Sequence, residues 1–375
     1  MTIRKILATL LALSMTLSLA ACGGNSTQTG TTQPEQTEQT EESSSVSDES
    51  ASDETTAENT ETETPADETE ASEPAEKVDI NLAALSGPTA LGMLDLLEKN
   101  ENGEAANNYN VTIATAPDEV TGKIISGELD IAALPTNVAA TLYNKTEGQV
   151  QIAALNTMGV LYVLETGDTI QSVADLAGKT IYATGQGSTP EYALNLVLEK
   201  NGLTPGEDVE IVFAADNAEI APLLASGEAQ VALLPQPFVT SVLTQNENVR
   251  VALDLTEEWD KAVNGESGLT MGCVVVRKEF AEQNKEALDR FLDEYKQSVE
   301  TVTSEEGLAH AAELAEHYNI IKAAVAEKAI PECNIVFVEG DEMQQIAGGF
   351  LQVLYDANPQ AVGGQLPNDD FYYKR

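Results

Sequence analysis

The chain reads SGELDIAALP at residues 126–135 and SGEAQVALLP at residues 226–235, an offset of one hundred residues. Each segment opens with a Ser-Gly-Glu turn, continues as an apolar strand and reaches a proline. Proline cannot donate a backbone hydrogen bond to a sheet, so Pro135 and Pro235 are expected to end their strands. The repeat therefore predicts two similar lobes that place equivalent strand ends beside one cleft.

Further pairs of segments follow in the same order along the chain. Strands that alternate with helical stretches favour a mainly parallel α/β sheet. A helix is expected between the first strand and residue 100, because Leu91, Leu94 and Leu97 recur at three-residue spacing. A general α/β alternation without duplication is the alternative. The matched pairs are INLAAL (80–85) with TIYAT (180–184), LEKN (97–100) with LEKN (198–201), NVTIATA (110–116) with VEIVFAA (209–215), and VQIAAL (150–155) with VRVALDL (249–255).

Residues 1–21 are predicted to be a lipoprotein signal peptide. Two basic residues precede an apolar run over 6–19, and two alanines follow it. This order is typical of a secretory signal. The segment ends in LAACG (19–23), which is similar to a bacterial lipobox, and the resemblance implies cleavage before Cys22 and lipidation of its sulfur. The alternative is an ordinary secreted protein with a cysteine at this place.

Residues 22–76 are predicted to be the lipidated cysteine and a disordered acidic tether. From Asn25 to Glu76 the chain has 16 acidic residues and no aromatic residue, lysine or arginine. Such a segment buries little apolar surface and repels itself. A flexible coil of this length spans about 40 Å root-mean-square. We therefore expect a solvated tether, anchored to the membrane by lipid without spanning it, rather than a binding tail.

The remaining residues, 77–375, carry 46 acidic and 17 basic residues. Nucleic-acid binding needs clustered lysine and arginine, and anionic lipid headgroups attract basic segments. The acidic surplus argues against both partners and is expected to keep the surface soluble. Nearly 300 residues exceed one typical domain, so two lobes are expected on length alone.

Four stretches carry a family resemblance: SGELDIAALPTNVA, DLAGKTIYATGQGSTPEYAL, SGEAQVALLPQPFV and the closing GGQLPNDDFYY. With the lipobox and the tether, they resemble the substrate-binding lipoproteins of bacterial ABC importers. Within these lipoproteins, the chain is similar to those with the type II periplasmic-binding-protein fold, which bind nitrate, taurine, alkanesulfonates or thiamine precursors. The resemblance implies two similar α/β lobes with mixed, mainly parallel sheets, joined by two hinge strands.

The resemblance also implies lobe boundaries. Lobe I is expected to comprise residues 77–158 and 269–375, and lobe II residues 159–268. The crossings between them are expected near Asn156–Val160 and Leu269–Val275.

The candidate ligand-binding residues lie where strands end. In open α/β sheets, ligands bind beyond the carboxyl ends of the strands, where helix starts offer free N–H groups. Ordinary helix capping is the alternative reading of the same loops. The candidates are Ser86, Gly87 and Thr89; Pro135, Thr136 and Asn137; Asn156; Gln186, Gly187, Ser188, Thr189 and Tyr192; and Gln236 and Phe238.

Two ligand chemistries stay open. No lysine or arginine lies in these loops, so a sulfonate or nitrate would depend on N–H groups and on hydroxyls, chiefly Thr89, Thr136, Ser188 and Thr189. A planar heterocycle such as a thiamine-related pyrimidine would instead use aromatic faces and polar side chains, namely Tyr192, Phe238 and Trp259 with Gln186, Glu191, Gln236 or Asn137. The absence of basic loop residues favours a neutral or weakly charged small organic ligand.

Other site chemistries have weak support. In GQGSTP (185–190), Pro190 replaces the third glycine of a dinucleotide fingerprint. His310 and His317, on an Ala- and Glu-rich helical stretch, indicate a solvated face rather than a metal site. Cys273 and Cys333 could pair outside the cell, but the apolar GCVVV around Cys273 favours a buried thiol.

The sequence thus predicts a non-enzymatic importer receptor outside the cytoplasm. It would use no metal or cofactor, act as a monomer, and deliver a small ligand to an ABC permease driven by a separate ATPase subunit. No G-x-x-x-x-G-K-[ST] motif occurs in this chain. One alternative is an extracytoplasmic enzyme on the same fold, with Glu191 as its acid or base. The other is a ligand-sensing lipoprotein.

Overall fold

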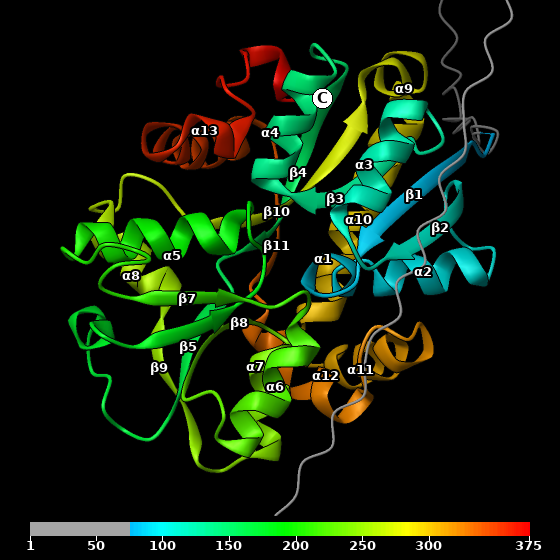
Figure 1. The fold of residues 1–375 in the computed structure, drawn as a ribbon. Coiled ribbons are helices and arrows are strands. Elements are labelled where there is room, and N and C mark those ends of the chain that lie inside the picture. The colour runs from blue at the N-terminus through cyan, green and yellow to red at the C-terminus, as the bar shows by residue number, and fades with distance from the viewer. Residues whose placement is uncertain (1–75) are drawn as a thin grey trace, which may run out of the picture. The chain divides into compact units, whose positions relative to one another are not determined.

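The computed structural model describes residues 76–375. The predicted signal peptide, Cys22 and the tether up to residue 75 lie outside the described residues. Two α/β lobes form within residues 76–375, one on a six-stranded sheet and one on a five-stranded sheet (Figure 1). The predicted fold class is therefore confirmed. Within the same residues, no helix combines the length and the apolar content that a membrane span requires.

The six-stranded sheet defines the first lobe and has the order β11-β4-β10-β3-β1-β2. β1 pairs in parallel with β2 and β3, whereas β10 runs antiparallel to β3 and β4, and β11 antiparallel to β4. The strands are β1 (Asp79–Leu85), β2 (Asn108–Ala114), β3 (Ile131–Pro135), β4 (Val150–Met158), β10 (Thr270–Arg277) and β11 (Ile335–Val338).

The five-stranded sheet defines the second lobe and has the order β7-β6-β8-β5-β9. β6 pairs in parallel with β7 and β8, and β5 runs antiparallel to β8 and β9. This arrangement reproduces β2-β1-β3-β10-β4 of the first lobe strand for strand. The strands are β5 (Leu161–Thr166), β6 (Thr180–Ala183), β7 (Glu210–Phe213), β8 (Val231–Pro235) and β9 (Val249–Asp254).

The repeated phrase occupies equivalent places in the two sheets. β3 ends at Pro135, which pairs with Gly272, and β8 ends at Pro235, which pairs with Leu161. The preceding helices each end at the glycine of the Ser-Gly-Glu turn, with φ of 80° at Gly127 and 76° at Gly227. Glycine adopts this left-handed conformation without steric cost, so it ends a helix readily. The duplication is therefore confirmed in topology.

The chain crosses between the lobes twice, and each crossing supplies the antiparallel strand of the sheet that it enters. The first crossing lies between Met158 and Leu161, inside the predicted range. The second prediction, Leu269–Val275, is wrong beyond its first residue. Thr270–Arg277 already form β10 in the middle of the first sheet, because this apolar run fills an interior strand, so the crossing lies before Thr270.

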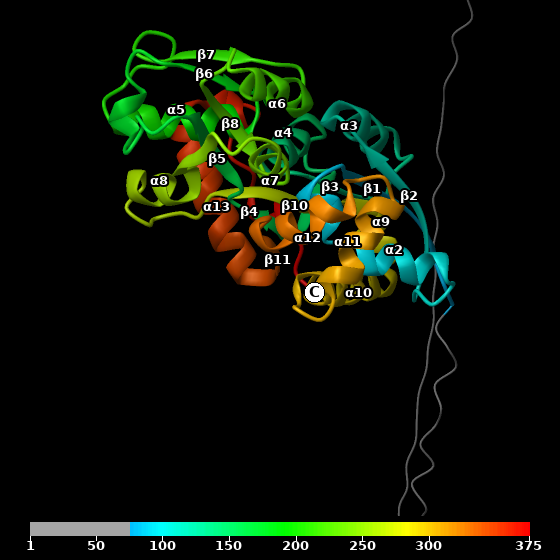
Figure 2. The ribbon, with the colours of Figure 1, turned by 90° about the horizontal axis from the view of Figure 1, so that it is seen from below.

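Helices cover both faces of the six-stranded sheet (Figures 1 and 2). α2, α10, α11 and α12 lie over one face, and α3, α4 and α13 over the other. The helices are α1 (Pro88–Leu91), α2 (Leu94–Glu101), α3 (Pro117–Ser126), α4 (Thr136–Lys145), α5 (Thr189–Lys200), α6 (Asn217–Ser226), α7 (Phe238–Gln245), α8 (Leu255–Ala262), α9 (Lys278–Gln283), α10 (Lys285–Thr303), α11 (Leu308–His317), α12 (Ala323–Ala329) and α13 (Gly340–Ala357), with short 3₁₀ helices η1 (Val173–Leu176), η2 (Ile330–Glu332), η3 (Pro359–Val362) and η4 (Asp369–Phe371).

The single helix predicted after β1 is broken into α1 and α2. In a continuous helix, the carbonyl of Gly92 would accept a hydrogen bond from the N–H of Leu96. Ser298 of α10 takes both groups instead: its hydroxyl donates to Gly92 O at 2.8 Å and accepts from Leu96 N at 3.2 Å. A serine two hundred residues away thus breaks a helix that its local sequence favours.

One apolar cluster is continuous across the two lobes, and α13 is part of it. Trp259 of α8 packs against Phe350 of α13 with ring centroids 5.6 Å apart. Its indole N–H donates to Ser267 O at 3.0 Å. Trp259 is fully buried, so in this structure it is a core residue and not the aromatic ligand platform that its sequence position allowed.

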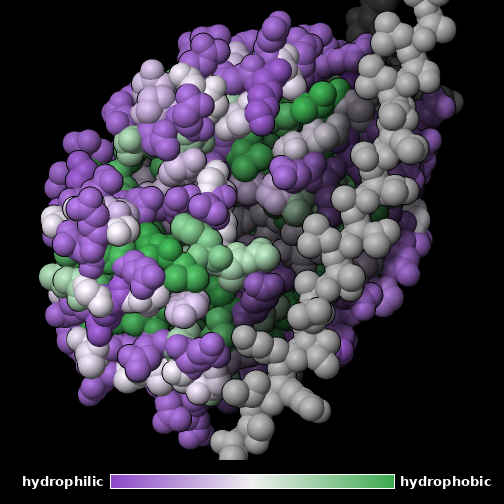
Figure 3. Space-filling view, in the orientation of Figure 1, coloured by the Kyte–Doolittle hydropathy of each residue, from purple (hydrophilic) through white to green (hydrophobic). Residues whose placement is uncertain are grey.

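The surface is mostly hydrophilic on the face seen in Figure 3, in keeping with the acidic composition. His310 and His317 lie exposed on α11, where their rings contact Glu98 and Glu101 of α2. This is the solvated face that the sequence indicates. Both Cys273 and Cys333 are buried free thiols, which confirms that interpretation of the cysteines.

Candidate functional site

Two loops of the first lobe follow strands at the predicted edge. After β1, Ser86 is exposed, Gly87 has a φ of 133° and precedes α1, and the hydroxyl of Thr89 donates to Leu85 O at 2.8 Å. After β3, Pro135 ends the strand and Thr136 begins α4, with its hydroxyl 3.1 Å from that of Thr270. Both hydroxyls are therefore engaged within the lobe.

The corresponding loops of the second lobe are built by glycines and by a glutamine. Gly185 and Gly187 have φ of 76° and 74° and fold the chain back, so that the Ser188 hydroxyl donates to Gly185 O at 2.7 Å. After β8, the side-chain carbonyl of Gln236 accepts from Thr240 N and from the Thr240 hydroxyl, at 3.2 and 2.9 Å. Gln236 thus holds the first turn of α7.

The two lobes are joined by a direct hydrogen bond between predicted site residues. The Thr189 hydroxyl, at the start of α5, donates to the Asn137 side-chain carbonyl, in the first turn of α4, at 3.0 Å. The Asn137 amide donates to Ala361 O of η3 at 3.2 Å. Asn137 and Thr189 are both buried. This contact brings together the start of one helix from each lobe.

Neither of these helix starts is capped by a side chain. Pro135 and Ser188 occupy the N-cap positions of α4 and α5 and make no capping hydrogen bond from a side chain. In the second lobe, by contrast, Asp216 caps α6 and Asp254 caps α8. A helix start carries partial positive charge, so two starts in contact favour an anion nearby. The first-turn acid of α5, Glu191, turns back to accept from Gly187 N.

A cavity of about 230 Å³ adjoins this contact. Asn137 and Gly187 line it from the two lobes, together with residues of α3, α4 and η3. Asp118 and Lys145 bring one charge of each sign to its wall. The cavity is of a size that suits a small molecule rather than a polymer.

The other candidates divide into separate groups. Asn156 is fully buried at the carboxyl end of β4 and lies beside Thr89, since both crowd the position where a Cβ on Gly272 would stand. Tyr192 and Phe238 are half-buried and pack against two different apolar clusters. Gln186 is exposed. Among residues 76–375, no hydrogen bond joins Gln236 to Asn137.

Burial also controls the reactivity of the thiol nearest these loops. Burial raises the pKa of the Cys273 thiol to about 12, and the Thr136 side chain offsets part of this rise. The thiol therefore stays protonated at neutral pH, and a protonated thiol is a poor nucleophile. Cys273 contributes packing beside the loops.

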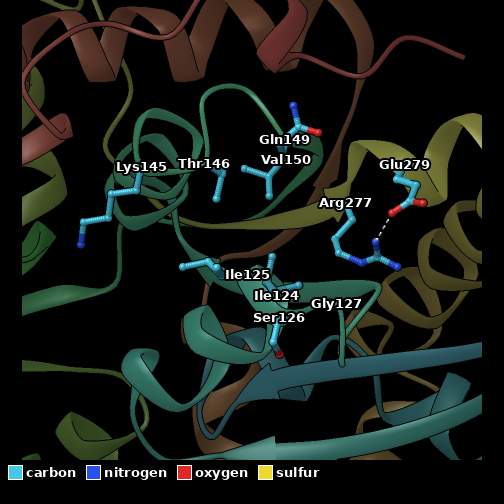
Figure 4. Close-up of a pocket in the computed structure, with 10 residues that line it drawn as sticks. All are labelled: Ile124, Ile125, Ser126, Gly127, Lys145, Thr146, Gln149, Val150, Arg277 and Glu279. Carbon is cyan, nitrogen blue, oxygen red and sulfur yellow. Dashed lines mark hydrogen bonds and ion pairs between the residues drawn. The ribbon is translucent and has the colours of Figure 1, made fainter. Parts of the chain in front are cut away.

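A larger cavity, of about 400 Å³, lies at the opposite ends of the strands (Figure 4). Arg277 lines it, but its guanidinium is bound to Asp130 at 2.8 Å and to Glu279 at 3.1 Å. Lys145 points away from the cavity in Figure 4. None of the predicted site residues lines this cavity, and its one exposed apolar side chain is Ile125.

Three residues near these loops, Thr270, Gly272 and Tyr295, were not among the predicted candidates. Thr270 and Gly272 lie in β10, which pairs with β3 and β4 across a sequence distance of more than one hundred residues. Tyr295 lies on the buried side of α10. The spacing of Tyr295 along the helix is that of an ordinary core residue, so its position near these loops is seen only in the folded structure. The glycine inside an apolar strand was an available signal, since glycine in a strand often marks a bulge or a close approach.

Comparison with known proteins identifies one matching family. The family described as "ABC transporter, phosphonate, periplasmic substrate-binding protein" matches residues 99–327. No curated protein sequence matches the chain.

Several solved structures are similar. An ABC transporter protein from Parabacteroides distasonis is 25% identical, with 79% of this chain and 99% of that chain covered and a TM-score of 0.66. The periplasmic aliphatic sulphonate binding protein SsuA from Escherichia coli is 14% identical, with 79% and 92% covered and a TM-score of 0.63. The alkanesulfonate-binding protein SsuA from Xanthomonas axonopodis pv. citri, bound to MOPS, is 16% identical, with 78% and 96% covered and a TM-score of 0.60.

Proposed function

The chain belongs to the phosphonate family of periplasmic substrate-binding proteins of ABC transporters, and we propose that it captures a small organic oxyanion between its two lobes. As a member of that family, it is the periplasmic substrate-binding component of an ABC import system. Proteins of this kind bind a small ligand and deliver it to an ABC permease. The proposal adds the ligand class and the place where it binds.

The observation that carries the proposal is the contact between two uncapped helix starts. The first turns of α4 and α5 come together through the Thr189–Asn137 hydrogen bond. Their free N–H groups and aligned dipoles favour an anion, and they do so without lysine or arginine. The names of the matched family and of the similar structures, phosphonate and sulphonate, are consistent with this chemistry.

A planar heterocycle is supported less well. Of the three aromatic side chains that could hold it, Trp259 is fully buried in the core. Tyr192 and Phe238 are engaged by different apolar clusters. The sequence favoured a neutral ligand because the loops have no basic residue. Two helix starts that meet also provide positive potential, so an anion can bind without a basic side chain.

Calorimetry on the full-length protein with methylphosphonate, methanesulfonate and inorganic phosphate tests the ligand class. Asn137→Asp places a negative charge at the two helix starts and should weaken binding of an anion by about tenfold or more, since like charges repel in a partly buried site. Asn110→Asp makes the same change on the exposed edge strand β2 and should leave affinity unchanged. Absence of binding to all three probes, or equal affinity in the two variants, would show that the site does not hold an anion.

The domain boundaries, the membrane attachment and the monomeric state remain part of the proposal. We propose lobe I as residues 77–158 and 269–375 and lobe II as residues 159–268, with closure around the crossings. We also propose a lipid anchor at Cys22, which rests on the lipobox-like LAACG. Cys22→Ser should release the protein from cell membranes without changing ligand affinity. Retention of that variant at the wild-type level would contradict the anchor.

A further inference from the structure

Asn156 sits in a β-bulge next to the first crossing. β10 pairs Leu155 with Cys273 and Thr157 with Gly272, so Asn156 is the extra residue of β4. A bulge re-aims a side chain that the regular alternation would point elsewhere, and bulges are common beside functional sites. Asn156 lies only three residues before Gly159, where the chain leaves for the second lobe.

The space for the Asn156 side chain comes from Gly272. A Cβ at Gly272 would stand 2.5 Å from Asn156 Oδ1 and 2.9 Å from Thr89 Cγ2. No residue with a side chain fits there without displacing the amide. The Asn156 amide is thereby held at the carboxyl end of the sheet, beside the first turn of α1.

A buried tyrosine hydroxyl lies in the same cluster. Tyr295 of α10 is fully buried, and a Cβ at Gly92, just after α1, would stand 3.1 Å from its hydroxyl oxygen. Burial raises the pKa of Tyr295, and the neighbouring Asn156 side chain offsets part of that rise. The hydroxyl is therefore a neutral donor at any physiological pH.

Both groups lack a partner outside the pair that they form. Among residues 76–375, Asn156 Nδ2 and the Tyr295 hydroxyl are close enough to influence each other, but neither has a partner among the other groups, although both are buried from solvent. Leaving a buried donor unpaired costs free energy, so each such group calls for an explanation. The contrast with Ser298 is direct. The Ser298 hydroxyl lies one turn after Tyr295 along α10 and is equally buried, but it donates to Gly92 O and accepts from Leu96 N.

We propose that Asn156 and Tyr295 form a neutral donor pair in the first lobe that binds an oxygen of the ligand. This inference rests on the proposed oxyanion function and extends it, because it names the groups that recognise the acceptor. Two N–H donors and one O–H donor select a ligand oxygen with free lone pairs, such as that of a phosphonate or a sulfonate, over an ammonium group. Asn156 lies three residues before the first crossing, so the proposal requires the lobes to open there for the ligand to reach the pair.

The test compares Tyr295→Phe with Ser298→Ala in the full-length protein. Each variant removes one buried hydroxyl from α10. Melting temperature without ligand, and affinity for methylphosphonate and methanesulfonate by calorimetry, are measured for both. Tyr295→Phe should weaken binding by about two- to tenfold and leave the melting temperature unchanged or raised, because it deletes an unpaired group. Ser298→Ala should lower the melting temperature and leave affinity unchanged.

Three outcomes overturn the donor pair. If Tyr295→Phe lowers the melting temperature as Ser298→Ala does, the hydroxyl already has a structural partner. If the wild type binds a probe and Tyr295→Phe binds it equally well, the hydroxyl does not touch the ligand, while the oxyanion function stands. If the wild type binds neither probe, the oxyanion function fails and the donor pair fails with it. Asn156→Ala, measured in the same way, should match Tyr295→Phe in affinity.

Discussion

The two lobes share one sheet topology but differ in what surrounds it. The second lobe keeps its five strands, and valines on both of its edge strands, Val212 and Val251, remain more than one-third exposed. The first lobe adds β11 and all helices after α8, including the long α10 and α13. Helices cover both faces of each sheet, so the difference lies in the helices that the first lobe adds beyond the shared unit.

This difference indicates a division of labour. The repeated core places helix starts and strand ends at the boundary between lobes, in the same way from both sides. The additions make the first lobe the larger one, and α13 extends from it to Trp259 of the second lobe. Any movement of the second lobe against the first must therefore involve the packing of Trp259 on Phe350.

The largest expected effect is on the contact between α13 and the second lobe. Trp259→Ala removes a fully buried indole that packs on Phe350 and donates to Ser267 O. Such a truncation typically costs about 3–5 kcal/mol of unfolding free energy. Chemical denaturation followed by circular dichroism measures the loss. Val212→Ala on the exposed edge of the second lobe should change stability by less than about 0.5 kcal/mol. Equal losses in the two variants would mean that α13 does not brace the second lobe.

The next effect concerns the first crossing. A Cβ on Gly159 would stand 2.1 Å from Thr256 Oγ1 of α8, so Gly159→Ala forces the two lobes apart locally. Overpacking of this kind costs about 1–3 kcal/mol. Small-angle scattering of the unliganded variant should show a larger radius of gyration than the wild type. Gly122→Ala in α3, where the added methyl meets open space, is the control and should leave the radius unchanged.

A smaller effect is expected at the bond between the lobes. Thr189→Val keeps the shape of the side chain but removes the donor to Asn137. A single buried hydrogen bond contributes about 0.5–1.5 kcal/mol. Scattering without ligand should shift toward the open form, and thermal melting should fall slightly. Thr180→Val, which loses an exposed bond to Glu210 within the second lobe, should alter neither measurement. Identical behaviour of the two variants would argue against a bond that holds the lobes together.

The smallest effect belongs to the helical addition of the first lobe. The hydrogen bond that the His310 ring donates to Glu98 raises the pKa of His310, which is more than half exposed. Protonated His310 therefore stabilises the folded state, fully below the unfolded pKa of about 6.5 and less as pH rises through the folded value. Exposure limits this to a few tenths of a kcal/mol. The melting temperature of His310→Gln should fall below that of the wild type at pH 5.5 and approach it at pH 8. High salt should reduce the difference.

The repeat was enough to predict the four strands that recur in each lobe, because strand period, turn glycines and terminal prolines are local signals. β5 and β11 have no repeated counterpart in the sequence and were not predicted. The repeat was also not enough to predict the break between α1 and α2, which depends on Ser298, or the start of β10, which depends on pairing partners far along the chain. The same limit applies to the site. Asn137 and Thr189 follow strand ends and could be named as candidates, whereas Tyr295 has the spacing of a core residue. Its unpaired hydroxyl is visible only once Gly92 and Asn156 are placed beside it.

The placement of β10 has a consequence for how the chain folds. β10 lies between β3 and β4, so without it the first sheet is divided into β1-β2-β3 on one side and β4 on the other. All five strands of the second sheet, by contrast, lie within residues 161–254. During synthesis from the N-terminus, all strands of the second sheet are made before Thr270, where β10 of the first sheet begins. The first lobe thus begins first along the chain but is completed last, because its sheet cannot close until β10 is available to pair with β3 and β4.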